Sequence, residues 1–179
     1  MNLVTVIQIV LFLGVSIGFF LYSRPYLKDP RKHGFYRFFG WELTLFLVVI
    51  NLRVWFEDPL SLHQIISWIL LLLAVLLAGV GFLQLHQFGK AEGSFENTTN
   101  LVEKGLYKFI RHPLYSSLIA ASWGAAMKQP DLLSVIAAVA ATICYFFTAK
   151  VEEEEMVEKF GEEYKAYMRR TKLFIPFVF

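Results

Sequence analysis

Long uncharged stretches alternate with short charged ones along this chain, which is typical of membrane spans and the loops between them. Asn2 to Leu21 contains no charged residue, and at a rise of about 1.5 Å per residue it is long enough to cross a bilayer. Leu62 to Leu85 and Leu132 to Ala149 are two further stretches of this kind. We therefore expect each of the three to form a transmembrane helix.

Two other apolar stretches are less regular. Phe38 to Phe56 carries Glu42 and Arg53, which lie near its expected ends, where charged groups can reach the membrane interface. The other interpretation of Glu42 is that it faces a cytoplasmic cavity. His112 to Met127 is short for a span, and Pro130 after it predicts a turn into the last apolar stretch. The pattern thus predicts an all-α fold, a polytopic membrane helical bundle of about five transmembrane helices.

Composition agrees with a membrane protein. Of the 179 residues 56% are hydrophobic and 18% are charged, and the mean hydropathy is +0.52, whereas a soluble domain carries about 25% charged residues. The length predicts a single membrane domain over residues 1–179, with three spans in 1–85 and a catalytic half in 86–179. The net charge of +2 gives no reason to expect a nucleic-acid partner.

Cysteine and histidine usage excludes some chemistry. Cys144 is the only cysteine, so no intramolecular disulfide can form, and its apolar surroundings indicate a small buried side chain. No cluster of cysteine and histidine with metal-ligand spacing is evident, so the sequence predicts no metal site.

The distribution of lysine and arginine predicts the orientation. All but two of the 17 basic residues fall in the segment Ser23–Arg37, in the loop from His86 to Arg111, or in the tail Lys150–Phe179. The exceptions are Arg53 and Lys128. Because cytoplasmic loops are enriched in these residues, we expect the basic side in the cytoplasm, the N-terminus outside and the C-terminus inside.

Chemistry-bearing residues gather in the segment Gly105–Tyr115. Pro113 fits the first turn of a helix, where its missing N–H costs nothing. The free N–H groups of that turn, together with Arg111 and His112, could hold an anion such as a carboxylate. His112 and Tyr115 are three apart and share a helix face. Composition alone favours equally the interpretation that these side chains anchor the helix at the membrane interface.

A second such segment, Glu152 to Tyr164, begins with consecutive acids directly after a span. At helical spacing Glu152, Met156 and Phe160 form one face, while Glu154 points toward solvent. An inward carboxylate could bind an ammonium group or a ribose hydroxyl. For the run as a whole, a solvated charged face is the more usual interpretation.

These segments resemble a known family. The first motif reads Leu-Val-x-x-Gly-x-Tyr-x-x-x-Arg-His-Pro-x-Tyr from Leu101 to Tyr115, and the second reads Glu-Glu-x-x-Met-x-x-x-Phe-Gly-x-x-Tyr-x-x-Tyr from Glu152 to Tyr167. In this order, flanking a helical hairpin, they resemble the integral-membrane methyltransferases that include isoprenylcysteine carboxyl methyltransferases and phospholipid N-methyltransferases. The resemblance covers roughly Leu101 to Phe179, whereas the N-terminal spans match in hydropathy alone.

The resemblance implies a cytoplasmic pocket for S-adenosylmethionine and methyl transfer to a lipid or lipid-like acceptor. The residues that it implies as cofactor-binding, with Arg111 added for its charge, are Leu101, Val102, Tyr107, Arg111, His112, Pro113, Tyr115, Glu152 and Glu153. If the acceptor is an amine, a proton must leave, and Glu152, Glu153 or His112 could take it as the catalytic base.

The sequence departs from the prenylcysteine type at two positions. Threonine stands at Thr99 where that type has histidine, and at Thr148 where it has a substrate-binding arginine. A neutral wall at Thr148 predicts an acceptor that needs no cationic clamp, such as a lipid amine, ahead of a prenylcysteine carboxylate. The alternative is that Lys150 or Arg111 supplies the charge.

Other functions remain open. A membrane reductase of sterol-like lipids that uses NADPH resembles this family in its C-terminal half, and a membrane scaffold without activity could keep the fold. A soluble methyltransferase is excluded because no glycine-rich strand-to-helix loop is evident.

Overall fold

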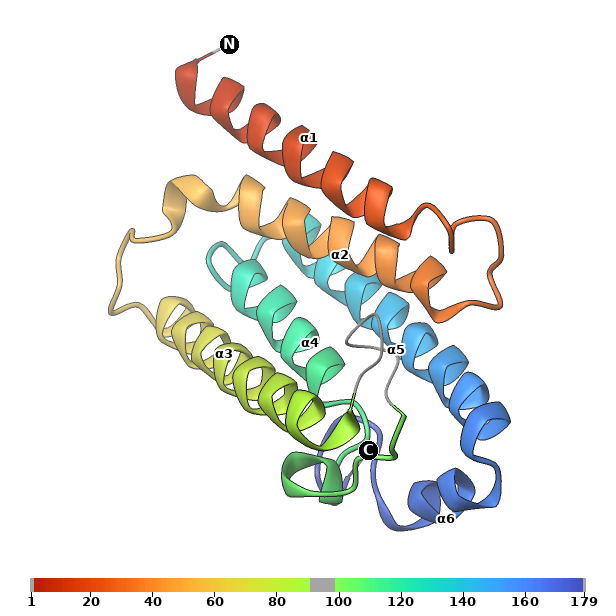
Figure 1. The fold of residues 1–179 in the computed structure, drawn as a ribbon. Coiled ribbons are helices and arrows are strands. Elements are labelled where there is room, and N and C mark those ends of the chain that lie inside the picture. Colours follow the sequence, from red (N-terminus) through yellow and green to blue (C-terminus); the bar gives the residue numbers. More distant parts are fainter. Residues whose placement is uncertain (1, 91–98, 179) are drawn as a thin grey trace.

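Six α-helices and two short 3-10 helices make up the computed structural model, which describes residues 2–90 and 99–178 (Figure 1). In chain order they are α1 (Leu3–Ser23), α2 (His33–Ile50), η1 (Leu52–Val54), α3 (Leu62–Gly89), η2 (Gly105–Lys108), α4 (Pro113–Ala126), α5 (Leu132–Phe160) and α6 (Glu162–Arg170). The described residues contain no β-strand, and a single isolated parallel bridge joins Ile110 to Lys172. The predicted all-α fold is confirmed.

The long helices form a bundle in which α4 and α5 occupy the middle (Figure 1). Helix α2 packs along α5, α3 packs along α4, and α1 packs on the outer side of α2. The short helix α6 lies at one end of the bundle, beside the C-terminal segment. The same end receives η2 and the start of α4, so the two sequence motifs meet there.

Three helices, α1, α3 and α5, are long and apolar enough to cross a membrane, by length and composition, among the described residues. Large hydrophobic side chains on α1 point outward, with Leu3, Val10 and Leu21 more than half exposed. A hydrophobic surface of this size belongs in lipid rather than in water. Helix α4 has 14 residues and α2 carries Arg37 and Glu42, so the count of five spans stays a prediction.

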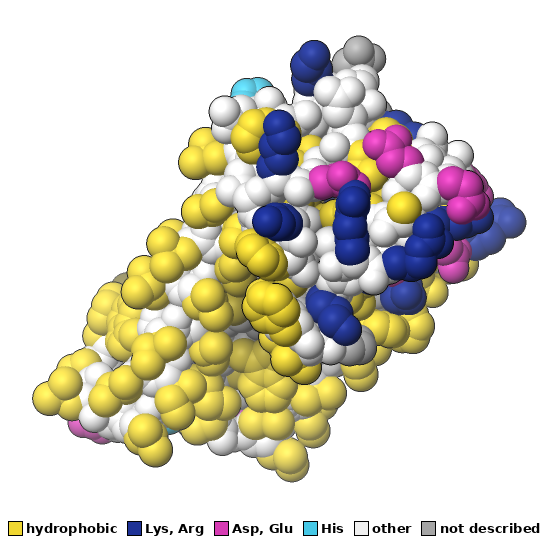
Figure 2. Space-filling model, turned by 90° about the horizontal axis from the view of Figure 1, so that it is seen from below, with side chains coloured by type: hydrophobic (Ala, Val, Ile, Leu, Met, Phe, Trp, Pro, Cys, Tyr) yellow, Lys and Arg dark blue, Asp and Glu magenta, His cyan; other side chains and the backbone are white. Residues whose placement is uncertain are grey.

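Charged side chains gather at one end of the molecule, while hydrophobic side chains cover most of the rest of the face in view (Figure 2). This separation matches a bundle whose apolar length lies in the bilayer and whose charged end lies at the aqueous boundary.

The second span differs from the prediction. It was expected over Phe38–Phe56, but α2 runs from His33 to Ile50. The helix ends early because the Asn51 side chain donates hydrogen bonds to the carbonyl oxygens of Leu47 and Ala125, at 3.1 and 3.2 Å. These bonds hold the C-terminal end of α2 against α4. Arg53 therefore lies outside α2, in η1.

Glu42 lies in the middle of α2, not near an end, so the expected exit of its charge to the interface is wrong. The Ser16 hydroxyl donates a 2.5 Å hydrogen bond to its carboxylate, and this contact joins α1 to α2. Glu42 is not among the residues that line the pocket described below.

The fifth helix is longer than predicted. The apolar stretch Leu132–Ala149 continues without a break through the acidic run to Phe160. Because the acids belong to the same rigid helix as the span, its packing against α2 and α4 fixes where Glu152 and Glu153 lie.

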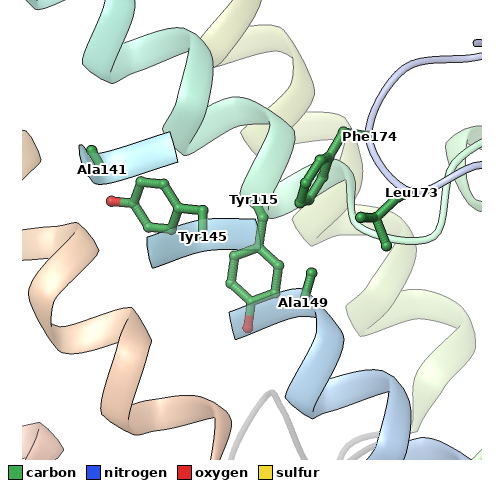
Figure 3. Close-up of a cluster of buried hydrophobic side chains, with 6 residues drawn as sticks. All are labelled: Tyr115, Ala141, Tyr145, Ala149, Leu173 and Phe174. Atoms are coloured by element: carbon green, nitrogen blue, oxygen red, sulfur yellow. The ribbon is translucent and has the colours of Figure 1, made fainter. Parts of the chain in front are cut away.

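Close packing of α2, α4 and α5 positions the site. Tyr115 of α4 lies beside Tyr145 and Ala149 of α5, and the C-terminal residues Leu173 and Phe174 close the cluster (Figure 3). On the α2 side, a Cβ on Gly40 would lie 2.6 Å from the ring of Tyr145, so only glycine permits this approach. The hydroxyls of Thr44 and Tyr145 lie 2.7 Å apart, which satisfies both inside the bundle.

Candidate functional site

The first motif forms a turn that leads into α4. Gly105 has a φ of +62°, and a Cβ there would lie 2.2 Å from the side chain of Gln84 on α3. Gln84 accepts a 2.8 Å hydrogen bond from the backbone N–H of Leu106. The Tyr107 side chain turns inward and donates a 3.3 Å hydrogen bond to the carbonyl oxygen of Gly81. The turn therefore presents its tyrosine to the interior of the molecule.

Helix α4 begins as the sequence predicts, with Pro113 in the first turn and His112 as the residue before it. The His112 ring is buried and stacks on the ring of Tyr115, with centroids 5.5 Å apart. The ring of Phe174 also packs against the His112 ring, in an edge-on arrangement. Packing against these two rings therefore fixes the His112 ring at the N-terminal end of α4.

The C-terminal segment pairs with the first motif. The backbone N–H groups of Arg111 and His112 donate to the carbonyl oxygens of Lys172 and Leu173, at 2.8 and 3.2 Å. The backbone N–H of Lys172 donates in return to the carbonyl oxygen of Phe109, at 3.0 Å. Since α6 precedes this segment, the pairing brings the second motif against the first.

Arg111 joins the two motifs through its side chain. Its Nε donates a 2.5 Å hydrogen bond to Glu153, and its Nη1 donates to the carbonyl oxygens of Met168 and Thr171, at 3.2 and 2.6 Å. These partners lie on α5, on α6 and in the C-terminal segment. The arginine therefore fixes the three elements to the start of α4.

Glu153 is 2% exposed and lies beyond the apolar part of α5. Burial alone raises the pKa of this carboxyl, but His112, Lys150 and Arg111 outweigh burial and lower the pKa to about 2. The ammonium group of Lys150 donates a 2.8 Å hydrogen bond to the second carboxylate oxygen. Glu153 is consequently an ionised and fully paired group.

Glu152 and His112 differ from Glu153 in their pairing. One carboxylate oxygen of Glu152 and the Nε2 atom of His112 are buried without a hydrogen-bond partner. The Glu152 oxygen lies 3.9 Å from Nδ1 of His112, and Nε2 lies 3.8 Å from Glu153, which exceeds hydrogen-bond distance in both cases. Buried polar atoms normally have a hydrogen-bond partner, so two buried polar atoms without one at the same pocket point to a polar ligand.

The pocket that these residues line lies between α2, α4, α5 and α6. Its lining comprises Arg37, Trp41, Leu85, Leu101, Val102, Tyr107, Arg111, His112, Pro113, Leu114, Tyr115, Leu118, Glu152, Met156, Phe160, Tyr164 and Tyr167. Both orphan atoms belong to lining residues. Most of the other lining side chains are apolar or aromatic, as is usual for sites that bind small molecules.

Three tyrosines give the pocket neutral hydroxyl groups. Burial raises the pKa values of Tyr107, Tyr164 and Tyr167 well above the usual range. These hydroxyls stay protonated at neutral pH, so each can donate a hydrogen bond. Tyr167 donates one of 2.7 Å to the carbonyl oxygen of Tyr107, which again links the two motifs.

Most of the predicted site residues meet in this pocket. All of the residues predicted to bind the cofactor line it except Glu153, which lies behind Arg111 and Lys150. Thr148 is buried and donates a 2.8 Å hydrogen bond to the carbonyl oxygen of Cys144, and it is not a lining residue. Its predicted contact with the acceptor stays a prediction.

Sequence reasoning missed the contribution of helices α2 and α3. Arg37, Trp41 and Leu85 line the pocket although they lie outside both motifs. Arg37 was expected to end a basic loop, but it lies inside α2. One signal was present: an arginine and a tryptophan four residues apart share a helix face.

The comparisons with known proteins agree on a family. A sequence model of the phospholipid methyltransferase family matches residues 62–163. Methanethiol S-methyltransferase 1 of Bradyrhizobium diazoefficiens is 38% identical over 71 residues, which are 40% of this chain and 24% of the relative. The match therefore spans about a quarter of that relative's length.

Isoprenylcysteine methyltransferases match over longer stretches. Protein-S-isoprenylcysteine O-methyltransferase B of Arabidopsis thaliana is 31% identical over 127 residues, which are 69% of this chain and 61% of the relative. The human protein-S-isoprenylcysteine O-methyltransferase is 35% identical over 109 residues, 59% of this chain and 36% of that protein. Both alignments are longer than the stretch covered by the C-terminal motifs.

Proposed function

The chain belongs to the phospholipid methyltransferase family, and on this premise we propose that it transfers a methyl group from S-adenosylmethionine to a lipid or lipid-like acceptor. The observation that carries the proposal is the pair of buried, unpartnered polar atoms on His112 and Glu152 in one pocket. A cofactor with an ammonium group, a carboxylate and ribose hydroxyls offers partners for both.

Residues of the two motifs would hold the cofactor. Glu152 accepts from an ammonium group or a ribose hydroxyl, and His112 bonds to a polar atom of the ligand through Nε2. Leu101 and Val102 supply apolar contact, and Tyr107 lines the same pocket. Glu153 and Arg111 keep this wall in place through their mutual ion pair.

S-adenosylmethionine supplies a methyl group activated by a sulfonium, so the protein needs neither a nucleophile nor a metal of its own. What the chain contributes is position and exclusion of water. If the acceptor is an amine, Glu152 or His112 takes the proton that the amine loses. Glu153 suits this role less, because Lys150 and Arg111, together with His112, lower the pKa of its carboxyl.

The proposed location is the cytoplasmic face of the membrane. The basic residues lie mainly at the end of the molecule that contains α6 and the pocket, and basic residues favour the cytoplasmic side. The cofactor would enter from the cytosol. A lipid acceptor would enter from the inner leaflet, with the N-terminus outside and the C-terminus inside.

The test is to incubate the purified protein with methyl-labelled S-adenosylmethionine and total membrane lipid extract, and to identify the labelled product. Methanethiol and an isoprenylcysteine analogue are added separately, since the relatives' names give these acceptors. Calorimetry measures cofactor binding by the native protein, by His112→Ala and by the matched control His86→Ala, which changes an exposed histidine. We expect weaker binding in the first variant alone. Binding of NADPH but not of S-adenosylmethionine would refute the proposal.

A further inference from the structure

A long apolar groove lies on a different face of α4 from the pocket described above. Its volume is about 850 Å³, which is in the range of sites that bind small molecules. From α4 its lining comprises Ser116, Ile119, Ala120, Trp123 and Met127, which recur at helical spacing and so form one stripe. The groove and the pocket share no lining residue. The groove is therefore a second candidate site.

Two apolar helices form the sides of the groove. The lining residues from α3 and α5 are Ile66, Leu70, Leu73, Leu77, Thr142, Ile143 and Phe146. Both helices are long and apolar enough to cross a membrane. The side chains of Leu73 and Ile143 are exposed, so the groove opens on the outer surface of the bundle. In a membrane this surface contacts hydrocarbon chains.

The polar side chains of the groove have their partners within the protein. The Ser116 hydroxyl donates a 2.9 Å hydrogen bond to the carbonyl oxygen of Phe174. Nε1 of Trp123 donates one of 3.1 Å to the Thr142 hydroxyl, which donates one of 2.8 Å to the carbonyl oxygen of Ala138. Each of these groups has a single hydrogen to donate. The groove therefore offers no donor to an occupant, and a polar occupant would lose its hydrogen bonds to water.

The dimensions of the groove favour a hydrocarbon chain over a helix. Its lining on α4 runs from Ser116 to Met127, a rise of about 17 Å. Over that length the volume corresponds to a cross-section of about 50 Å². A helix with its side chains is about 10–12 Å wide and needs a cross-section of about 80–110 Å². The groove is therefore too narrow to enclose a transmembrane helix of a second copy.

One end of the groove carries exposed lysines. This end, beside the first turn of α4, is lined by Leu106, Phe109, Ile110, Phe174, Ile175 and Pro176. The ammonium group of Lys108 lies 5.9 Å from the ring centroid of Phe109. The backbone N–H of Lys172 donates to the carbonyl oxygen of Phe109, so this second lysine lies at the same end. Both lysine side chains are exposed.

We propose that the groove binds a hydrocarbon chain of an anionic bilayer phospholipid, whose phosphate group lies against Lys108 and Lys172. Basic residues beside cavities between transmembrane helices bind headgroups of this kind. At the far end of the groove the nearest lysine is Lys128, which is buried and donates a 3.0 Å hydrogen bond to Gln64. The headgroup therefore belongs at the end beside Phe109. This inference goes beyond the proposed function and does not rest on it.

The bound phospholipid supports one wall of the pocket from behind. Phe174 lines the groove, and its ring packs edge-on against the buried ring of His112. Ile110 also lines the groove and directly precedes Arg111 and His112 in the chain. A chain in the groove packs against both of these lining residues. The phospholipid is thus a structural ligand of the bundle, separate from the methyl acceptor.

Trp123 provides a direct probe, because brominated acyl chains quench the fluorescence of a tryptophan that they contact. The protein in micelles is titrated with brominated phosphatidylglycerol, which is anionic, and with brominated phosphatidylcholine, which has no net charge. The difference in quenching between the native protein and Trp123→Phe isolates Trp123 from the other three tryptophans. We expect this difference to saturate, and to reach half its maximum at a lower mole fraction of phosphatidylglycerol than of phosphatidylcholine.

Two variants test the two parts of the site. Lys108→Gln should raise the mole fraction of phosphatidylglycerol for half-maximal quenching by about fivefold, without effect on phosphatidylcholine. Lys28→Gln, which changes an exposed lysine between α1 and α2, is the matched control. Ala120→Phe fills the groove and should abolish the quenching of Trp123. Val75→Phe, at an exposed position of α3 outside the lining, should leave it unchanged.

Each other outcome overturns the inference. Equal mole fractions for the two lipids refute the headgroup site, and the absence of saturable quenching of Trp123 refutes the chain site. Protection of Trp123 at rising protein concentration would show that a second copy covers the groove. If Ala120→Phe does not fold, the comparison of the native protein with Trp123→Phe still decides.

The outcomes also separate this inference from the proposed function. A raised KM for the methyl acceptor in Ala120→Phe would show that the acceptor's own chain occupies the groove, which refutes a separate phospholipid while methyl transfer stands. If the native protein methylates no acceptor, the proposed function fails. The quenching of Trp123 by the two brominated lipids then still tests the groove.

Discussion

The guanidinium of Arg111 and the carboxylate of Glu153 form a buried ion pair, with Nε and Oε1 2.5 Å apart, that connects the start of α4 to the far end of α5. The two residues are 42 positions apart in the chain. Arg111 lines the pocket and Glu153 lies behind it, so the pair fixes the distance between the walls formed by His112 and Glu152. This relationship makes the ion pair a determinant of pocket shape.

Replacing Arg111 by glutamine should destabilise the protein. Glu153 would lose its shortest partner while staying buried, and Lys150 would remain as its ion-pair partner. The loss should therefore lie below the about 3–5 kcal/mol that an uncompensated buried charge costs. The carbonyl oxygens of Met168 and Thr171 would lose a donor as well. Denaturant titration in mixed micelles measures the free energy of unfolding of each variant. Arg169→Gln, which changes an exposed arginine on α6, is the control. Equal stability of the two variants would contradict the structural role.

The lowered pKa of Glu153 predicts how stability depends on pH. Its pKa is about 2 in the folded protein, against an ordinary value of 4.5. A carboxyl whose folded pKa is lowered contributes stability above its unfolded pKa and loses it as pH falls through the folded one. The stabilisation should therefore be constant above about pH 5 and decline between about pH 4.5 and pH 2.

This dependence can be measured with Glu153→Gln. The difference in unfolding free energy between the native protein and this variant should shrink below about pH 4.5, because the variant has no carboxyl to protonate. Glu154→Gln, at the exposed neighbouring position, is the control. A difference that stays constant down to pH 3 would show that Glu153 is not the stabilising carboxylate.

Much of the fold follows from apolar length alone. A helix that crosses lipid must be apolar over the length that lies in the lipid. The starts of α1, α3 and α5 and the end of α1 were therefore predicted to within a few residues. The acidic run was expected at helical spacing, but its unbroken continuation from the span to Phe160 was not predicted, because the spacing does not show where one helix ends and the next begins. The motif residues converge as expected because the start of α4 and the acidic run of α5 lie at one end of the bundle.

Arg37 shows where sequence reasoning fails. A cation beside an apolar stretch normally indicates its boundary, so Arg37 was assigned to a loop. Its burial depends on Tyr22 and Tyr26, which precede α2, and on Trp41 within it. The hydrophobic pattern contains no information on such tertiary contacts. In the same way, the partners of Arg111 on α5 and α6 cannot be inferred from the motif that contains it.

Glu152→Gln should weaken S-adenosylmethionine binding. The substitution keeps the shape of the side chain but removes the charge that would pair with a cationic ligand group, and loss of a charged hydrogen bond costs about 1.5–3 kcal/mol. Affinity should therefore fall by about tenfold to a hundredfold. Calorimetry on Glu152→Gln and on the solvent-facing Glu154→Gln compares the two acids. If both bind the cofactor equally well, the orphan oxygen of Glu152 is not a ligand atom.

The orientation in the membrane can be tested by cysteine tagging in a Cys144→Ser background. Lys28→Cys and Lys172→Cys lie at the basic end and should react with an impermeant reagent from the cytoplasmic side. Leu60→Cys, in the exposed connection between η1 and α3, should react from the outside. Labelling of Lys172→Cys from the outside would reverse the topology and place the pocket away from the cytosol.

Gly105→Ala should damage the pocket through the backbone. Gly105 has a left-handed conformation with φ +62°, which costs an alanine about 1–2 kcal/mol. An added Cβ would also lie 2.2 Å from the Gln84 amide, which holds the N–H of Leu106. Because Tyr107 follows directly in the same turn, we expect lower stability together with weaker cofactor binding. Gly79→Ala, where no atom lies within 4 Å of the added Cβ, is the control and should be neutral or slightly stabilising.

A double variant separates the two causes at Gly105. Gln84→Ala combined with Gly105→Ala removes the steric clash with the amide but keeps the backbone strain. If the clash dominates, the double variant should be more stable than Gly105→Ala and should regain part of the cofactor affinity. If the conformation dominates, the second substitution removes a hydrogen bond to Leu106 and should lower stability further. Full stability and binding in Gly105→Ala itself would contradict the inward turn that brings Tyr107 to the pocket.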